Sequence, residues 1–104
     1  MNGDLLKGEE RAAALKRIPE WKAVDGERDA IKRTFTFENF DVAFYKFMTP
    51  VASEAERMDH HPEWFNVYNR VEVTLATHTC NGVSLKDITM AEFMDKTAAA
   101  ATKN

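Results

Sequence analysis

All three histidines of this 104-residue chain lie close together in the sequence. His60 and His61 stand in the segment DHHPEW at residues 59–64, and His78 follows shortly after it. An imidazole has an unperturbed pKa near 6.5, so it can give and take protons at neutral pH. Trp64 offers a flat apolar wall for a ring-shaped ligand. The cluster therefore indicates either a proton-transfer site or a metal site.

The two neighbouring histidines cannot share one task. A proline follows His61 and disfavours helical backbone there, and neighbours in an extended segment point in opposite directions. Asp59 could fix the tautomer of an imidazole through a ring N–H. A zinc site would use His60 or His61 with His78 and with Cys80 or Asp59, but structural zinc sites usually contain several cysteines. Because Cys80 is the only cysteine and has no local sign of activation, proton transfer is favoured.

Composition sets the class of protein. Hydrophobic residues make up 44% of the chain and charged residues 30%, which is typical of a soluble globular domain. The net charge of −3 gives no basic surface for nucleic acid, and no apolar run is long enough to span a membrane or act as a secretory signal. A single cysteine suits a reducing compartment, the cytoplasm or the nucleus. We expect one domain over residues 1–104, with a frayed tail at 98–104.

The first half of the chain predicts a helix and a hairpin. Residues 9–16 contain strong helix formers, and Pro19 stops their helix. Residues 21–24 are predicted to form a short strand, followed by a turn and by an alternating strand over 30–37. Arg33 interrupts the apolar side of that strand, so we expect it near a sheet edge.

The central helix has the clearest pattern. Its apolar residues recur at steps of three or four, with Asn39 as the cap at its start. Pro50 lies in its middle, so we expect a kink within residues 46–50 or two shorter helices. The stripe is interpreted as core, with the alternative that part of it meets a second subunit. The stripe consists of Phe40, Phe44, Phe47, Val51, Ala55 and Met58.

A second hairpin follows, with strands at residues 65–67 and 71–77. A three-residue turn would set Phe65 opposite Leu75 and keep one clean apolar face, whereas the two-residue turn considered mixes polar and apolar side chains. We predict the three-residue turn. With this register, His78 projects from the end of the strand away from the helices.

The C-terminal segment carries two capping boxes, at residues 84–87 and 89–92. We predict a helical turn at 84–87 and a main helix at 89–101, and we interpret Asp87 as a cap rather than a catalytic group. The chain as a whole predicts an α+β fold of order α-β-β-α-β-β-α, with a four-stranded antiparallel sheet and helices packed on one face.

Residues 59–69, DHHPEWFNVYN, and the alternating stretch up to His78 closely resemble the signature of the pterin-4a-carbinolamine dehydratases. That family is also known as the dimerisation cofactor of a homeodomain transcription factor (DCoH). The similarity extends from residues 9–11 through 28–31 and 44–49 to 87–88, and so covers nearly the whole chain. The resemblance implies the same α-β-β-α-β-β-α domain and an enzyme without a metal.

The resemblance also implies a reaction. The substrate would be 4a-hydroxytetrahydrobiopterin, left when an aromatic amino acid hydroxylase uses tetrahydrobiopterin, and loss of water would give quinonoid dihydrobiopterin for reuse. N5 must lose a proton while the hydroxyl group on C4a gains one. One general acid and one general base suffice, so no cofactor is expected and the pterin is the substrate.

By position, the resemblance places the pterin between residues 59–61 and the strand end at 76–79. We expect His60 and His78 to form the acid–base pair, with His61 mainly binding and orienting the pterin; which of His60 and His61 transfers the proton stays open. No metal ligand is expected. The predicted catalytic residues are His60, His61 and His78, and the predicted substrate-binding residues are Asp59, His60, His61, Trp64, Ala76, Thr77, His78 and Thr79.

The resemblance further implies a homodimer or homotetramer through edge strands and the helix at residues 39–58. An alternative function is an interaction module that acts as a dimerisation cofactor or coactivator of a transcription regulator, without direct contact to nucleic acid or membrane. Pro50 replaces an ordinary helix former in that helix, which bears on the oligomer and on a coactivator role but leaves the histidine motif intact. The expected location is the cytoplasm, with the nucleus as a second site.

Overall fold

The structure, a computed structural model, describes residues 3–102. It confirms the α+β class and the predicted element order, with the central helix in two segments and a short 3₁₀ turn before the last helix. Within the described chain, no helix has the length and apolar composition needed to cross a membrane. The elements are α1 (Gly8–Lys16), β1 (Lys22–Ala23), β2 (Ile31–Thr36), the π-helix η1 (Val42–Met48), α2 (Thr49–Met58), β3 (Glu63–Val67), β4 (Arg70–Leu75), the 3₁₀ turn η2 (His78–Cys80) and α3 (Leu85–Ala101).

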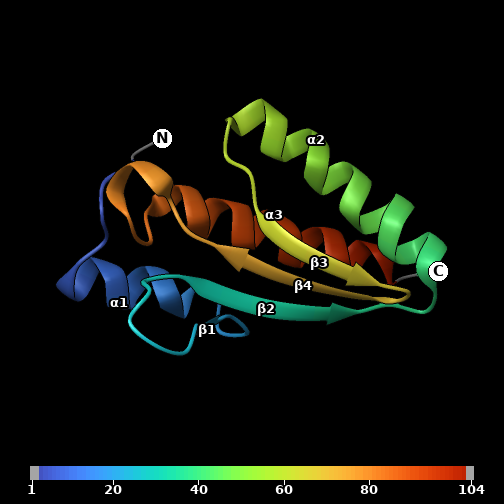
Figure 1. Cartoon of the computed structure of the whole chain (residues 1–104), viewed down its shortest axis with the longest axis horizontal. Helices are drawn as coiled ribbons and strands as arrows, with labels where there is room; N and C mark the ends of the chain where they lie inside the picture. Colours follow the sequence, from blue (N-terminus) through green and yellow to red (C-terminus); the bar gives the residue numbers. More distant parts are fainter. Residues whose placement is uncertain (1–2, 103–104) are drawn as a thin grey trace.

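The four strands form one antiparallel sheet in the order β1-β2-β4-β3. Figure 1 shows α3 passing behind the strands and α2 lying along the β3 side. Side chains on one face of the sheet are buried against these helices, as period-two alternation requires. The Phe47 ring packs against Phe35 and Phe37, with centroid distances of 4.6 and 5.0 Å. The buried strand residues include Ile31, Phe35, Val71, Val73 and Leu75.

The outer edge of β2 is covered over only part of its length. Strand β1 pairs with Ile31 and Lys32 alone, so β2 lacks a neighbour on that side from Arg33 onward. The Arg33 guanidinium lies 4.4 Å from the centroid of the Phe35 ring, and its Nη1 is 2.7 Å from Asp95 Oδ1. Arg33 therefore lies at a sheet edge, as its sequence position suggested, while its charge is matched by a carboxylate from α3.

The register of the second hairpin differs from the prediction. Val67 pairs with Arg70, so the strands are joined by a two-residue turn. The predicted three-residue turn, with Phe65 opposite Leu75, is wrong. Trp64 points to the helix-covered face and is partly buried, whereas Phe65 points to the opposite face and is 60% exposed.

A contact from outside the hairpin explains this register. Asn69 Nδ2 donates to the carbonyl oxygen of Phe37 at 2.9 Å, and the Phe37 N–H donates to the Asn69 carbonyl at 2.8 Å. With Asn69 held in this way, Tyr68 takes the left-handed conformation, with φ of +50°. A tyrosine rarely adopts this backbone, so the turn has no local sequence signal.

The central helix changes type at the predicted break. Its first turn is capped by Asn39, whose Oδ1 accepts from the Val42 N–H at 3.0 Å, as expected. The segment Val42–Met48 is π-helical, and α2 begins at Thr49 with Pro50 in its first turn. Met48 and Thr49 keep right-handed helical backbone, so η1 runs directly into α2, and Pro50 lies where the helix changes from π to α type. The two-segment alternative is therefore confirmed.

The apolar stripe of this helix is only partly core. Ala43, Phe47, Val51 and Ala55 are buried, but Phe40 and Phe44 are each 39% exposed. A π-helix bonds residues i and i+5, so it turns less per residue than an α-helix. Phe40 and Phe44 are thereby rotated away from the sheet, while Ala43 stays buried.

The last helix is a single element. It runs without interruption from Leu85 to Ala101, with Ser84 as its cap, so the separate helix start predicted at Thr89 is wrong. The predicted frayed tail begins too early, because Ala98 is buried and helix continues to Ala101. Residues 103–104 of that tail lie outside the described part of the chain.

Candidate active site

A pocket of about 180 Å³ lies where the loop before β2, the start of β3 and the segment after β4 meet. It contains two imidazoles, from His61 and His78. Both are exposed to solvent, so a ligand can reach them. The lining residues are Arg28, Asp29, His61, Glu63, Ala76, Thr77, His78, Asn81 and Gly82.

The end of α2 sets the directions of the two neighbouring histidines. Asp59 adopts the left-handed conformation, with φ of +51°, and ends the helix. The Asp59 N–H donates to Glu56 at 3.2 Å and the His60 N–H donates to Ala55 at 3.0 Å, a pattern that closes many helix ends. The chain then leaves the helix with His60 buried and His61 exposed.

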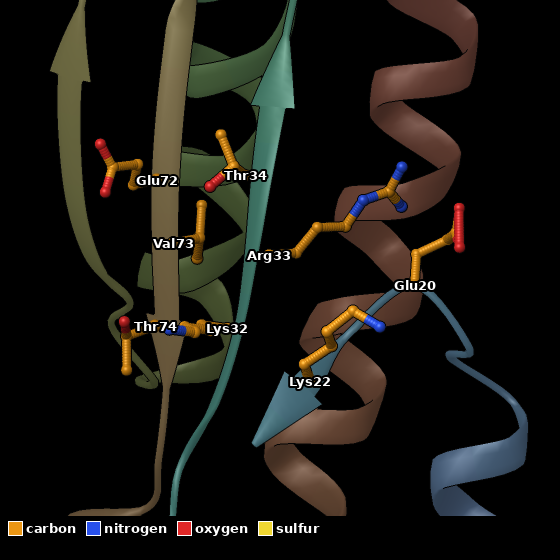
Figure 2. A pocket seen from close by; sticks show the side chains of 8 residues that line it. All are labelled: Glu20, Lys22, Lys32, Arg33, Thr34, Glu72, Val73 and Thr74. Atoms are coloured by element: carbon orange, nitrogen blue, oxygen red, sulfur yellow. The ribbon is translucent and has the colours of Figure 1, made fainter. Parts of the chain in front are cut away.

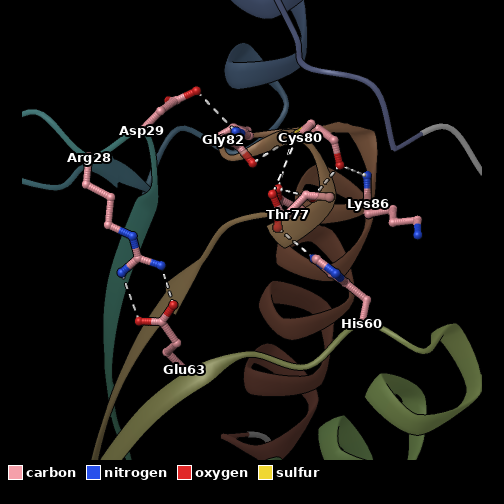
Figure 3. Close-up of polar contacts among 11 residues, drawn as sticks. Arg28, Asp29, His60, Glu63, Thr77, Cys80, Gly82 and Lys86 are labelled. Atoms are coloured by element: carbon pink, nitrogen blue, oxygen red, sulfur yellow. Dashed lines mark hydrogen bonds and ion pairs between the residues drawn. The ribbon is translucent and has the colours of Figure 1, made fainter.

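His60 is held by a buried carboxylate. Its side chain is 8% exposed, and its Nε2 lies 2.7 Å from Oδ1 of Asp87, which is fully buried. The second oxygen of Asp87 accepts from Thr77 Oγ1 at 2.7 Å and from the Ser84 N–H at 2.9 Å (Figure 3 shows His60 and Thr77). A carboxylate in this position fixes the orientation of an imidazole. Asp87 is therefore both the cap of α3 and the partner of His60.

His61 lies at the rim of the pocket. Its side chain is 60% exposed, and its Nε2 lies 2.8 Å from Oε1 of Glu56, which is itself exposed. An exposed pair of this kind has little energetic weight, and a ligand can replace it. The ring of His61 is thus available to a bound molecule.

His78 is positioned by a closed loop rather than by a strand. Strand β4 ends at Leu75, two residues earlier than the predicted strand. Thr77 then forms an isolated bridge with Gly82, with N–H to carbonyl distances of 2.7 and 3.3 Å. His78 begins the 3₁₀ turn inside this loop. The parity argument from the strand therefore does not place His78, although the residue does line the pocket.

Two ion pairs border the pocket. Arg28 donates to both carboxylate oxygens of Glu63, and Arg11 donates to both oxygens of Asp29 at 2.7 and 3.2 Å (Figure 3 shows Arg28, Asp29 and Glu63). Hydrogen bonds from Arg28 lower the pKa of Glu63. Burial alone would raise the pKa of Asp29, but hydrogen bonds from Arg11 and the Val83 N–H, with the charge of Arg11, lower it. Both carboxylates are therefore ionised at neutral pH.

The predicted site residues are divided between the pocket and its surroundings. The structure brings His61, Ala76, Thr77 and His78 together in the pocket wall, while the other predicted residues do not line it. Sequence reasoning missed the charged residues and the loop residues of the wall. The residues outside the wall are Asp59, His60, Trp64 and Thr79, and those missed are Arg28, Asp29, Glu63, Asn81 and Gly82.

The alternative metal site has no matching geometry. Across residues 3–102, no three or more histidine, cysteine, aspartate or glutamate side chains are arranged to hold a metal ion. Cys80 Sγ lies 3.5 Å from the Gly82 carbonyl and 3.7 Å from the Thr77 carbonyl, inside the loop that carries His78. The cysteine thus contacts backbone oxygens of its own loop.

A larger hollow of about 510 Å³ lies elsewhere, over β1, β2 and β4 (Figure 2). It is bordered by side chains of both charges and contains no imidazole. It therefore lacks the proton-transfer groups found in the smaller pocket. Its lining residues are Glu20, Lys22, Lys32, Arg33, Thr34, Glu72, Val73 and Thr74.

The sequence matches known proteins over almost its whole length. A profile of the family described as pterin 4 alpha carbinolamine dehydratase matches residues 4–97. A protein from Burkholderia multivorans is 55% identical over 96 residues, which cover 92% of each chain. One from Paraburkholderia xenovorans is 53% identical over 94 residues, or 90% of this chain and 96% of that one. Both carry the name pterin-4-alpha-carbinolamine dehydratase, given by inference.

The fold also matches a solved structure. A crystal structure from Brucella melitensis, described as a transcriptional coactivator/pterin dehydratase, superposes with a TM-score of 0.85 at 52% sequence identity. The match covers 91% of this chain and 99% of that one. Fold and sequence therefore lead to the same group of proteins.

Proposed function

The chain belongs to the pterin-4a-carbinolamine dehydratase family of hydro-lyases, and we propose that its reaction takes place in the pocket beside His61 and His78. The observation that carries the proposal is the pair of accessible imidazoles in one pocket wall, with a third imidazole held behind Thr77. The substrate is a 4a-hydroxytetrahydropterin, and we propose tetrahydrobiopterin as its parent compound.

The reaction is an elimination of water. A base removes the proton from N5, the C4a–O bond breaks, and the leaving hydroxyl group takes a proton from an acid to depart as water. The electron pair left at N5 forms the N5=C4a double bond of the quinonoid dihydropterin. Each proton transfer by a positioned side chain contributes about 10²–10⁴-fold to such a rate. Imidazoles suffice for both transfers, so we propose that no cofactor takes part.

We assign the proton transfers to His60 and His78, and the binding of the pterin to His61. His60 lies outside the pocket wall, and Asp87 links it to Thr77 in that wall. Asp87 supports the role of His60, because a buried carboxylate 2.7 Å from Nε2 fixes the ring and leaves Nδ1 for the proton transfer. His78 is exposed in the pocket wall, where it can reach a hydroxyl group. His61, at the rim, is placed to hold the ring system. The charged pair of Arg28 and Glu63 borders the same space.

Single substitutions separate these roles. His60→Gln keeps an N–H donor for Asp87 but cannot exchange a proton, so kcat should fall by about 10²-fold while the fold is retained. His78→Ala should also lower kcat, whereas His61→Ala should mainly raise KM. Turnover is followed with synthetic carbinolamine, and urea unfolding checks each fold. If His61→Ala removes kcat and His60→Gln does not, the proton transfers belong to His61 and His78 and our assignment is wrong.

A second candidate function, assembly with a partner protein, has one supporting observation. Phe40, Phe44 and Tyr45 are exposed together on the central helix, with ring centroids 5.0–5.5 Å apart. We propose that this surface and the edge strand β3 support a homodimer or homotetramer, and that a transcription regulator is the alternative partner. Light scattering should show an oligomer that Phe44→Ala weakens; a monomer at all concentrations would contradict the proposal.

The location of the protein also remains a proposal. The similar proteins named above come from bacteria, so we propose the cytoplasm and do not retain the nucleus. Fluorescence microscopy of a tagged chain in a bacterial host would test this, and a signal confined to the envelope would contradict it.

A further inference from the structure

The position of His78 depends on what holds its loop at the base. The loop closes through the bridge between Thr77 and Gly82, and Asn81 turns it in the left-handed conformation, with φ of +54°. His78 itself has no side-chain hydrogen bond among those found in residues 3–102. Its place in the pocket is therefore set by the backbone of the loop and by the groups that anchor that backbone.

Asp29 is such an anchor. Its Oδ2 accepts a hydrogen bond from the Val83 N–H at 3.1 Å, directly after the bridge that closes the loop. Figure 3 shows this carboxylate reaching toward Gly82 from the segment directly before β2. On the other side of the chain, the Leu6 N–H donates to the Val83 carbonyl at 2.9 Å. Val83 is thus fixed through both of its backbone polar groups.

The approach of Asp29 to the loop leaves no room for a side chain at position 82. A Cβ atom built on Gly82 would lie 2.5 Å from Asp29 Oδ2 and 2.4 Å from Leu5 Cδ1. Both distances are far below a normal contact, so an added methyl group must displace both the Leu5 side chain and the Asp29 carboxylate. Glycine at this position is therefore required by the close packing of the loop against the carboxylate.

Arg11 holds Asp29 in this orientation. Its two terminal nitrogens contact the two carboxylate oxygens at 2.7 and 3.2 Å, a two-point geometry that fixes the carboxylate plane. Arg11 comes from α1, which has no residue in the pocket wall, so it acts on the pocket only through Asp29. Arg28, the residue before Asp29, forms an ion pair with Glu63 on β3. Residues 28–29 therefore contact both the 77–82 loop, through Asp29, and β3, through Arg28.

We propose that Asp29, oriented by Arg11, is a positioning residue for the dehydration, which acts through the Val83 N–H and Gly82 to hold the 77–82 loop and so places His78 in the pocket. The proposal rests on the proposed function for its effect on turnover. Its effect on the loop does not depend on that function.

Asp29→Ala and Gly82→Ala disturb the same contact from opposite sides. Both should lower kcat by about 10- to 100-fold, since small displacements of a reacting group have effects of this size, while KM changes by less than about threefold. Asp29→Asn keeps an oxygen for the Val83 N–H, so it should recover part of the kcat lost in Asp29→Ala. The kcat of Arg11→Ala should lie between the values for Asp29→Ala and for the parent protein.

Arg17→Ala is the matched control. Arg17 also forms a two-point ion pair, with Glu92 at 2.7 and 3.0 Å, but this pair joins the end of α1 to α3 outside the pocket wall. This variant should keep the parent kcat and KM. Urea unfolding identifies any variant that does not fold, and Arg11→Ala and Asp29→Asn then carry the test.

The second readout is the NMR signal of the His78 imidazole. It should shift or broaden in Asp29→Ala and Gly82→Ala and stay unchanged in Arg17→Ala. Folded Asp29 and Gly82 variants with parent kcat and an unmoved His78 signal would overturn the proposal, as would a raised KM with an unmoved signal, which assigns Asp29 to substrate binding. If His78→Ala itself keeps full kcat, the proposed function fails, but the shift of the signal still decides whether Asp29 positions the loop.

Discussion

Replacing Asp87 with alanine should destabilise the protein far more than the loss of an exposed carboxylate. Asp87 is fully buried and faces three donors: His60 Nε2 at 2.7 Å, Thr77 Oγ1 at 2.7 Å and the Ser84 N–H at 2.9 Å. In Asp87→Ala, the Thr77 hydroxyl keeps a partner in Ser84 Oγ, 2.5 Å away. The other two donors are left buried without an acceptor.

The expected magnitude follows from those two donors. Each buried donor left without a partner costs about 1–3 kcal/mol, so two of them cost about 2–6 kcal/mol. We therefore expect Asp87→Ala to lower the free energy of unfolding by about 3–5 kcal/mol, the middle of that range. A domain of this kind is typically stable by about 5–15 kcal/mol, so the variant should fold with a clearly lower urea midpoint.

Urea unfolding followed by circular dichroism measures the effect. Asp87→Asn keeps one oxygen and should lose less than Asp87→Ala. Asp41→Ala, at an exposed position near the start of the central helix, is the control and should cost less than about 1 kcal/mol. A loss below about 1 kcal/mol in Asp87→Ala would refute the reasoning, because the buried donors must then have found other partners.

Two further predictions concern the hydrophobic core and the loss of stability at low pH. Phe47→Ala should cost about 3–5 kcal/mol, because the ring is fully buried between Phe35 and Phe37, whereas Phe44→Ala in the same helix should cost much less; equal urea midpoints would contradict this. The pKa values of Asp29 and Glu63 are lowered in the folded protein, so the unfolded chain binds more protons in acid. The two carboxylates therefore contribute to folding stability above about pH 4–4.5, and this contribution is lost as the pH falls through their folded pKa values. As the pH is lowered from about 6 to about 2.5, the urea midpoint should fall less steeply for Asp29→Asn than for the parent protein. Identical slopes would contradict a stabilising role for the ionised Asp29.

Local sequence patterns predict where helices and strands lie better than they predict which distant residues these elements contact. The helix cap at Asn39 and the break at Pro50 rest on side chains that act within a few residues, and both are confirmed. The hairpin register was missed because Asn69 is held by Phe37, which lies in another hairpin. No pattern within the second hairpin contains that contact, and a left-handed Tyr68 runs against local preference.

The candidate site shows the same division. The clustered histidines led to the region of the candidate pocket, because a motif with two of them ends a helix beside it. Asp87 was interpreted as a cap, which it is, but its contact with His60 joins residues far apart in the sequence. The carboxylate of Asp29 reaches the His78 loop across a similar separation. Such contacts follow from the way the helices pack on the sheet, which the sequence pattern does not specify residue by residue.

The two outer edges of the sheet are unequal. The edge formed by β1 and the uncovered part of β2 carries Lys22 and Arg33, and charged edges discourage the addition of another strand. The β3 edge instead displays Phe65 and Val67, which are 60% and 48% exposed. A sheet with two open edges could grow without limit, copy upon copy. If copies of the chain joined strand to strand, a charged edge on one side would leave β3 against β3 as the favoured pairing, an arrangement with twofold symmetry that would be complete after two chains.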